Sequence, residues 1–168
     1  DTADNCPNVP NDTQENNDYD DKGDVCDDDD DNDGVKDNQD DCAQGEIGWT
    51  ANETTDNDGD GCKDDSDEDP DDDNDAVPDH QDNCPLVANP QQSNVDFDSD
   101  GDACDFDSDN DGVFEDDDLC AQGVVGWSSN PQTDYDGDGC LDSNLEDPDD
   151  DNDGVVDQDD LCPKGILD

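Results

Sequence analysis

Apolar residues are sparse along the chain, and none of the acidic segments leads into an amphipathic helix of ten or more residues. Asp40 and Asp82 are each followed, after a single intervening residue, by Cys42 and Cys84. The intervening segments are rich in proline, asparagine, glycine and glutamine, which favour turns. The pattern therefore predicts an irregular fold of loops and turns, with little regular secondary structure beyond single helical turns.

The composition indicates that such a fold needs help to form. The 168 residues include 59 acidic and 4 basic side chains, giving a formal net charge of -55, and only 25% are hydrophobic. A chain of this kind is typically disordered, because it has too little apolar surface to offset the entropy lost on ordering. We therefore expect disulfides and bound divalent cations to stabilise the fold, the cations by relieving carboxylate repulsion.

The cysteines reveal an internal repeat, in which Cys6 returns as Cys84 and Trp49 returns as Trp127. A repeat of fixed period sets the architecture of the chain. The nine cysteines stand at positions 6, 26, 42, 62, 84, 104, 120, 140 and 162, and the intervals of the first half recur in the second. We predict the end of a preceding repeat at 1–5, double repeats at 6–83 (modules 6–41 and 42–83) and 84–161 (modules 84–119 and 120–161), and the start of another repeat at 162–168.

The regular cysteine spacing favours disulfides and therefore an oxidising, extracellular compartment. There is no C-x-x-C pair, and the single histidine, His80, argues against zinc. Pairing neighbours from the start gives loops of one size and leaves Cys162 for a partner beyond Asp168, whereas the alternative scheme needs loops of two sizes and leaves Cys6 instead. The preferred pairs are Cys6 with Cys26, Cys42 with Cys62, Cys84 with Cys104, and Cys120 with Cys140.

The acidic segments have the spacing of calcium loops. Residues 56–67, DNDGDGCKDDSD, match D-x-D-x-D-G-x-x-D-x-x-D at every position. In such a loop the side chains at positions 1, 3, 5, 9 and 12 and the carbonyl of position 7 converge on one ion, while glycine suits the sharp turn at position 6. Hard, numerous oxygen ligands suit calcium better than magnesium, which prefers near-ideal octahedra that retain water.

Eight loops follow this spacing, so we expect at least about eight calcium ions. The predicted ligands, with position 7 contributing its backbone carbonyl, are Asp29, Asp31, Asp33, Val35, Asp37 and Asp40; Asp56, Asp58, Asp60, Cys62, Asp64 and Asp67; Asp71, Asp73, Asp75, Val77, Asp79 and Asp82; Asp107, Asp109, Asp111, Val113, Glu115 and Asp118; Asp134, Asp136, Asp138, Cys140 and Asp142; Asp149, Asp151, Asp153, Val155, Asp157 and Asp160; Asn16, Asp18, Asp20, Asp24 and Asp27; and Asn94, Asp96, Asp98, Asp102 and Asp105.

Two loops depart from the pattern at single positions. Ala76 stands where its copy has Gly154, so we expect that loop to bend differently or to bind calcium more weakly. Leu145 occupies position 12 of the loop that begins at Asp134, and Glu146 is the expected substitute.

The loops that begin at Asn16 and Asn94 lack glycine at position 6. An alternative register, starting two residues later, would place Gly23 and Gly101 at the turn. Lys22 lies inside the first of these loops and is expected to weaken its attraction for a cation.

These residues bring a known family into view. The segments DNCPNVPNDTQ (4–14), DNCPLVANPQQ (82–92), GDVCDDDDDNDGVKDNQDDC (23–42) and GDACDFDSDNDGVFEDDDLC (101–120) resemble thrombospondin type 3 repeats. The resemblance covers essentially the whole chain. It implies an elongated tandem array in which the backbone wraps a string of calcium ions and successive cysteines are bridged in pairs.

One element departs from this resemblance. Residues 42–62 and 120–140 carry G-x-x-G-W in place of the usual NCP turn, which looks like a variant in repeat arrays of microbial surface proteins. We expect Trp49 and Trp127 each to fill a small local core with Ile47 or Val125 and the nearby disulfide. The alternative is an exposed tryptophan that contacts a neighbouring strand, protein or sugar.

Other short motifs and the charge narrow the function further. Asn11 in N-D-T and Asn52 in N-E-T are candidate glycosylation sites. Enzyme activity is not expected, because no nucleophile has a partner base, and His80 is expected to be solvated. Nucleic acid and anionic membranes would be repelled by this charge, and no stretch suits membrane insertion.

The leading hypothesis is an extracellular, calcium-stiffened spacer, stalk or fibre of a cell-surface, adhesive or matrix protein. Its partners would be neighbouring repeats of a longer chain, with lateral self-association into filaments as an extension of that role. The alternatives are calcium storage or mineral nucleation by the acidic surface, and ligand or glycan binding through the tryptophan elements.

Overall fold

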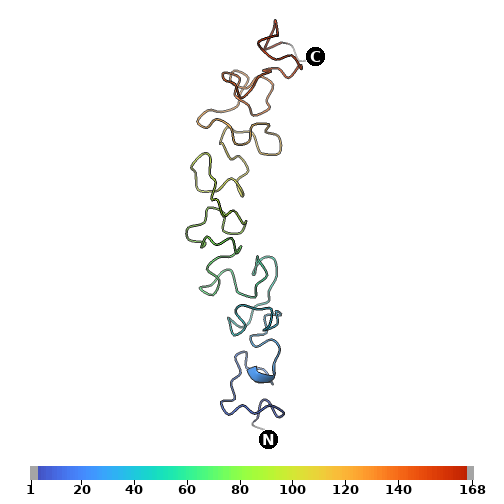
Figure 1. The fold of residues 1–168 in the computed structure, drawn as a ribbon, viewed down its shortest axis with the longest axis vertical. Coiled ribbons are helices and arrows are strands. Elements are labelled where there is room, and N and C mark those ends of the chain that lie inside the picture. Colours follow the sequence, from blue (N-terminus) through green and yellow to red (C-terminus); the bar gives the residue numbers. More distant parts are fainter. Residues whose placement is uncertain (1–3, 166–168) are drawn as a thin grey trace. The chain divides into compact units, whose positions relative to one another are not determined.

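The fold consists of loops and turns, as the sequence predicts. The computed structural model describes residues 4–165. Within that range the only helix is η1, a 3₁₀ helix at Asp24–Cys26, and there is no α-helix or strand (Figure 1). The prediction of an irregular, loop-rich chain is therefore confirmed. No helix in the described part is long and apolar enough to cross a membrane.

The chain divides into two compact units, Asp1–Pro90 and Gln91–Asp168. Each unit contains four of the acidic loops, and the loops of the second unit repeat those of the first in the same order. The loop that begins at Asp29, for example, returns as the loop that begins at Asp107. The module boundaries placed at 83 and 84 from the cysteine period stay a prediction.

The interior of each unit consists of half-cystines and carboxylates. The buried hydrophobic residues are Cys6, Cys62, Cys84 and Cys140. The buried polar residues are Asp30, Asp31, Asp33, Asp40, Asp56, Asp69, Ser108, Asp109, Asp111, Asp134, Asp147, Asp150 and Asp151. Burial of ionised carboxylates is costly unless they are paired or bound to a metal, so this core calls for cations.

The predicted disulfides are formed. Cys6–Cys26, Cys42–Cys62 and Cys120–Cys140 have Cα–Cα distances of 5.8, 5.1 and 5.2 Å, within the usual range for a disulfide. Cys84 and Cys104 are disulfide-bonded as well. Cys162 is free and exposed. The pairing with loops of one size is confirmed, and the alternative scheme that leaves Cys6 without a partner is excluded.

The tryptophans are half-buried, but their expected apolar neighbours are not. Ile47 and Val125 remain 45% and 40% exposed, so the expected local core with these two residues is wrong. The reason lies in the backbone, since Gly48 between Ile47 and Trp49 has a φ of +88° and turns the chain. The indole Nε1 of Trp49 instead donates to the carbonyl oxygen of Glu46 at 2.6 Å.

Candidate metal centres

The acidic loops begin with two successive turns closed by aspartate side chains. In the loop at 29–40, the Asp33 amide donates to Oδ1 of Asp31 at 3.2 Å, and the Val35 amide donates to Oδ1 of Asp33 at 2.7 Å. Such Asx turns bend the backbone around its own carboxylates. The bond from position 7 to position 5 recurs in all eight loops.

A second pair of bonds closes each loop across its width. The Asp30 amide at position 2 donates to Oδ1 of Asp37 at 2.9 Å, and the Asp37 amide donates to the Asp28 carbonyl at 3.2 Å. Both bonds have counterparts in all eight loops, with Glu115 replacing aspartate in one. The residue at position 9, the fourth predicted side-chain ligand, therefore also closes the loop through its hydrogen bonds.

Most loops turn at position 6 with a left-handed backbone. Gly34, Gly61 and Gly154 have φ values of +102°, +90° and +88°. Ala76 adopts the same conformation, with a φ of +77°. The expectation that this loop bends differently is therefore wrong. The hydrogen bond from the Ala76 amide to Oδ2 of Asp71, 3.0 Å, holds it in place.

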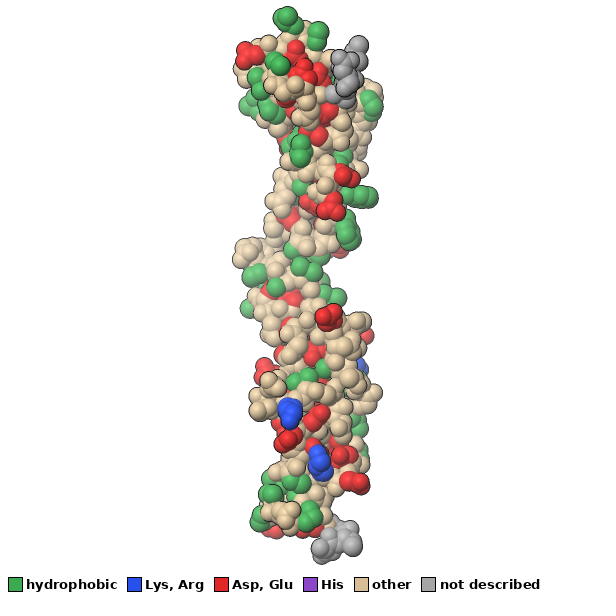
Figure 2. Space-filling view, turned by 90° about the vertical axis from the view of Figure 1, so that its right-hand side faces the viewer, with side chains coloured by type: hydrophobic (Ala, Val, Ile, Leu, Met, Phe, Trp, Pro, Cys, Tyr) green, Lys and Arg blue, Asp and Glu red, His purple; other side chains and the backbone are tan. Residues whose placement is uncertain are grey.

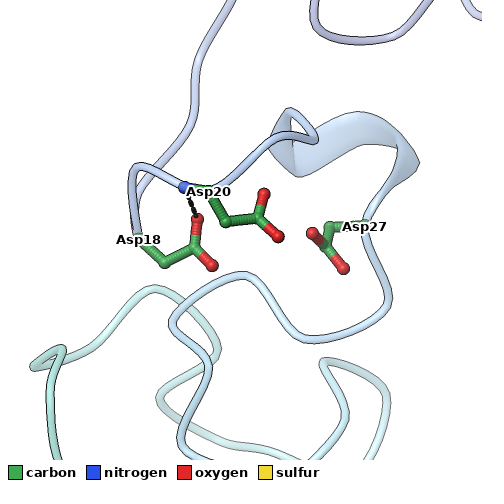
Figure 3. A group of neighbouring side chains, drawn as sticks. All are labelled: Asp18, Asp20 and Asp27. Atoms are coloured by element: carbon green, nitrogen blue, oxygen red, sulfur yellow. Dashed lines mark hydrogen bonds between the residues drawn. The ribbon is translucent and has the colours of Figure 1, made fainter.

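The loops without that glycine follow the register that begins at Asn16 and Asn94. The Asp20 amide donates to Oδ1 of Asp18 at 2.9 Å, as position 5 donates to position 3 elsewhere (Figure 3). The left-handed residue is at position 4, where Tyr19 has a φ of +63° and Phe97 of +64°. Position 4 of the other loops is also left-handed, so a register that starts two residues later does not fit this pattern.

Neighbouring loops are joined by the asparagine at position 4. Asn152 donates from Nδ2 to Oδ2 of Asp138 in the preceding loop at 2.9 Å. Asn32 and Asn110 make the corresponding bonds to Asp18 and Asp96, and Asn74 donates to Asp58. Each of these loops thus supplies a donor to a predicted ligand of the loop before it.

The turns bring the first three predicted side-chain ligands together. Carboxylate oxygens lie within 4.8 Å of one another in the groups Asp29, Asp31 and Asp33; Asp56, Asp58 and Asp60; and Asp71, Asp73 and Asp75. A further group joins Asp18 and Asp20 to Asp27, which follows η1, and Figure 3 shows these three carboxylates around a common space. Such oxygen cages suit a hard divalent cation.

The carboxylates at these sites have buried oxygens that no hydrogen-bond donor reaches. Asp29 and Asp71 have such an atom at position 1, Asp73 at position 3, and Asp33 and Asp111 at position 5. Buried polar atoms normally have a partner, and a divalent cation is a partner that can satisfy several carboxylate oxygens at once. The donor set and its unpaired oxygens therefore fit calcium. The position-7 carbonyls stay predicted ligands.

Burial, together with the charges of neighbouring carboxylates, raises the pKa of several carboxyl groups. Burial raises the pKa of Asp33 to about 6, and the charges of Asp31 and Asp29 add to the effect. Burial likewise raises the pKa of Asp40 and Asp58 to about 6. A carboxylate with a raised pKa is destabilised in its charged form. A bound divalent cation would remove that destabilisation.

A second type of carboxylate group lies where one loop meets the next. Carboxylate oxygens of Asp64, at position 9, Asp69 and Asp72 lie within 4.8 Å of one another. Burial raises the pKa of Asp72 to about 7, and Asp79, Asp64 and Asp69 raise it further. The position-9 ligand of this loop is therefore placed in a group separate from Asp56, Asp58 and Asp60.

Asp69 is a site residue that sequence reasoning missed. Asp67, the predicted position 12, is exposed, whereas Asp69 is 5% exposed and accepts the Asp71 amide at 3.0 Å. Asp40, at position 12 of its own loop, accepts the Cys42 amide at 2.7 Å in the same way. The two extra residues, Asp67 and Glu68, follow the turn from Lys63 to Ser66 that the other loops share, and the Glu68 amide donates to Oγ of Ser66 at 3.1 Å. The missed signal is an aspartate two residues before the next loop begins.

The second unit repeats this arrangement. Asp147 is 4% exposed and accepts the Asp149 amide at 2.9 Å, while Leu145 is almost fully exposed. Glu146, the expected substitute, accepts the amides of Val124 at 2.8 Å and Leu141 at 3.2 Å. Glu146 therefore supports the G-x-x-G-W element, and Asp147, like Asp69 in the first unit, is the buried carboxylate that precedes the next loop. Whether Glu146 binds an ion stays a prediction.

Two lysines place ammonium groups against predicted ligands. Lys22 pairs with Asp27 at 2.8 Å. Burial raises the pKa of Asp27, but the hydrogen bonds from Lys22 and the Asp28 amide outweigh it and lower the pKa below its ordinary value. Lys164 contacts Asp142 and lies 3.5 Å from Asp150. These positions already accommodate a positive charge.

The glycosylation candidates lie in ordered turns. Asn52 is exposed, and its Nδ2 donates to the Thr50 carbonyl and to Oγ1 of Thr55, both at 2.8 Å. Asn11 is half-buried, and its Nδ2 donates to Oδ1 of Asn5 at 2.7 Å. Whether either carries a glycan stays a prediction. His80 is exposed, with a ring nitrogen 3.0 Å from Gln81 Nε2.

Disulfide-linked acidic loops, repeated along the chain and suited to divalent cations, define a calcium-binding repeat protein. The family model of the thrombospondin type 3 repeat matches residues 15–45 and 53–92. Over these two segments the chain therefore contains thrombospondin type 3 repeats, which are calcium-binding structural repeats. A search of curated proteins finds no match.

Proposed function

We propose that the chain is an extracellular structural segment that calcium stiffens, serving as a spacer, stalk or fibre of a cell-surface, adhesive or matrix protein. One observation carries the proposal: the interior consists mainly of half-cystines and carboxylates, and several of these carboxylates have a buried oxygen that no donor reaches. An interior of that composition has little stability of its own. Its order depends on cations.

Calcium would act on the chain as a set of cross-links. An ion bound by Asp56, Asp58 and Asp60 fixes the positions of three carboxylates that otherwise repel one another. The adjoining group at Asp64, Asp69 and Asp72 lies between that loop and the next one. Ions at both places would fix each loop and its junction with the following loop, which is what a stiff spacer requires.

Small-angle scattering of the intact chain tests this function directly. In millimolar calcium we expect a narrow ensemble with a well-defined cross-section. Chelator should broaden the ensemble, because uncompensated carboxylates repel and the apolar core is too small to resist them. An identical scattering curve in calcium and in chelator would contradict the proposal.

The proposed location rests on the disulfides and on the repeat type. Disulfides persist in oxidising compartments, and breakage of the Cys42–Cys62 bridge would open the loop that contains the G-x-x-G-W element. The proposed partners are neighbouring repeats of the same longer chain, and the lateral contacts of a filament. No catalytic role forms part of the proposal.

A further inference from the structure

Two positions come close together in every acidic loop. One is the residue directly before position 1, and the other is position 8, directly before the fourth predicted side-chain ligand. The bond that closes the loop holds them side by side. In the first unit they are Asp28 and Lys36, with the Lys36 Nζ 3.6 Å from Oδ2 of Asp28. In the second unit the equivalent residues are Phe106 and Phe114, and the Glu115 amide donates to the Phe106 carbonyl at 3.0 Å.

The two phenylalanines are exposed. Phe106 is 80% and Phe114 is 66% exposed, and neither contributes to the interior of its unit. Figure 2 shows apolar side chains standing among acidic ones on the molecular surface. Two exposed aromatic side chains, on backbone segments joined by the bond from the Glu115 amide to the Phe106 carbonyl, are available for an intermolecular contact.

The surroundings of the rings have changed as well. Asn38 and Gln39, which are exposed in the first unit, become Asp116 and Asp117 in the second, and these are also exposed. Relative to the first unit, this surface has lost the ion pair of Lys36 and Asp28. It has gained two aromatic rings and two uncompensated carboxylates.

We propose that Phe106, Phe114, Asp116 and Asp117 form a docking surface for a cationic segment of a partner protein, rich in arginine or lysine. Aromatic faces attract guanidinium and ammonium groups, and adjacent carboxylates strengthen that attraction. The four residues are called the aromatic–acidic patch below. This role goes beyond stiffening and does not depend on it.

Charge selects this occupant over the alternatives. A second copy of the chain also has a net charge of -55, of which eight divalent ions would offset only 16, so it does not complement Asp116 and Asp117 at this surface. A neutral sugar would use the rings but would gain little from Asp116 and Asp117. A basic segment uses all four residues.

The first test is titration calorimetry of the intact, calcium-loaded chain with the peptide acetyl-(Gly-Arg)6-amide at 150 mM salt. Because cation–π contacts at exposed sites are modest, we expect F106L/F114L to weaken the tightest binding step about 5- to 30-fold for two rings. This variant preserves charge and apolar character, so diffuse attraction to other carboxylates cancels in the comparison. Unchanged affinity would overturn the proposal.

Phe97 supplies a matched control. It is 86% exposed and occupies position 4 of a different loop, the one that begins at Asn94. F97L should leave peptide affinity unchanged. An equal loss of affinity in F97L and F106L/F114L would show that any exposed ring suffices, and the proposal would fall.

A transfer experiment tests the same surface by gain of function. D28F/K36F/N38D/Q39D reproduces the aromatic–acidic patch in the first unit, and the number of tight peptide sites should rise from one to two. F106W/F114W should bind more tightly than wild type, because tryptophan is the best cation–π partner. Failure of both changes would refute the proposal, and so would a shift in the sedimentation of F106L/F114L without peptide, which would indicate self-association.

Discussion

The Asp40 carboxylate lies directly against the backbone of Gly61, at the turn of the next loop. A Cβ atom on Gly61 would overlap Oδ1 of Asp40, and the same holds for Gly139 and Asp118 in the second unit. The last predicted ligand of one loop therefore packs on the turn of its neighbour, where a Cβ atom would displace it. The Asp41 amide, which donates to the Asp60 carbonyl at 2.8 Å, fixes this approach.

Replacement of Gly61 by alanine should disturb the first unit more than the same change at Gly59. Both glycines have positive φ, but only Gly61 faces a neighbouring group within 4 Å. G59A should cost about 1–2 kcal/mol from the left-handed backbone, and G61A should cost clearly more. Thermal unfolding in saturating calcium measures both. Equal midpoints for the two variants would argue against the contact with Asp40.

Replacement of Ala76 by glycine should stabilise its loop. Alanine at a φ of +77° is strained, and glycine adopts that conformation without cost. We expect a gain of about 1 kcal/mol for A76G and a similar loss for G154A at the equivalent position. Calcium-dependent unfolding of the two variants makes a matched comparison. A destabilised A76G would mean that the alanine methyl group contributes a compensating contact.

The buried Asp69, and not the exposed Asp67, should determine calcium affinity at its loop. D69N removes a charge from a site where an Oδ2 atom already lacks a donor, and should weaken one calcium site by roughly an order of magnitude. D67N should have almost no effect. Calorimetric titration of both variants decides between them, and a greater loss in D67N would restore the register predicted from the sequence.

Lys164 should compete with calcium in the second unit. Its ammonium contacts Asp142 and Asp150, which correspond to Asp64 and Asp72 of the first unit, where the residue equivalent to Lys164 is Leu86. K164L should strengthen calcium binding at this group several-fold. The effect should be greatest at low salt, because the competing interaction is electrostatic.

The reverse change, L86K, is the matched control for this competition. It should weaken binding in the first unit, because it brings a positive charge to a group that has none. Direct calcium titration at two salt concentrations reads out both variants. Tighter binding in L86K would contradict the competition.

The raised pKa values predict opposite pH responses with and without calcium. Asp33, Asp40 and Asp58 have pKa values of about 6 and Asp72 of about 7, against about 3.8 when unfolded. The folded state therefore binds protons more tightly. Without calcium, the stability from these groups is fully present below pH 4 and is lost as pH rises through 6 to 7.

With calcium the dependence reverses, because protons and calcium compete for the same oxygens. Calcium affinity should be highest above pH 7 and should fall as pH decreases through 7 to 5. Scattering and circular dichroism across pH 4 to 8, in chelator and in calcium, distinguish the two cases. Parallel trends in the two solutions would indicate that these carboxyl groups are not ligands.

Much of this structure could be predicted from local sequence. The cysteine pairs could be identified because their spacing is uniform, and the loops at 29–40 and 71–82 because their ligands alternate within a few residues of one another. Turn formation there is local: the Val35 amide needs only the side chain of Asp33, two residues away. Local hydrogen bonds of this kind can be predicted from a short sequence motif, because both partners lie within it.

The burial of Asp69 and the exposure of Ile47 depend on the local backbone conformation. Asp69 escaped prediction because Asp67 and Glu68, ordered by the bond from the Glu68 amide to Oγ of Ser66, lengthen its loop by two residues, which a fixed twelve-residue pattern does not allow. The exposure of Ile47 escaped it because hydrophobicity alone does not reveal that Gly48 turns the chain before Trp49. In both cases a backbone conformation, and not residue type, decides what is buried.

The asparagine bridges between loops have a consequence for how ions enter and leave. Asn152 donates to Asp138, a predicted ligand of the loop before its own, and Asn74 does the same for Asp58. When a loop loses its ion and becomes less ordered, its asparagine no longer donates to the carboxylate of the preceding loop. Within each unit, occupancy should therefore be cooperative, with a Hill coefficient above one, so that stiffness changes over a narrow range of calcium concentration.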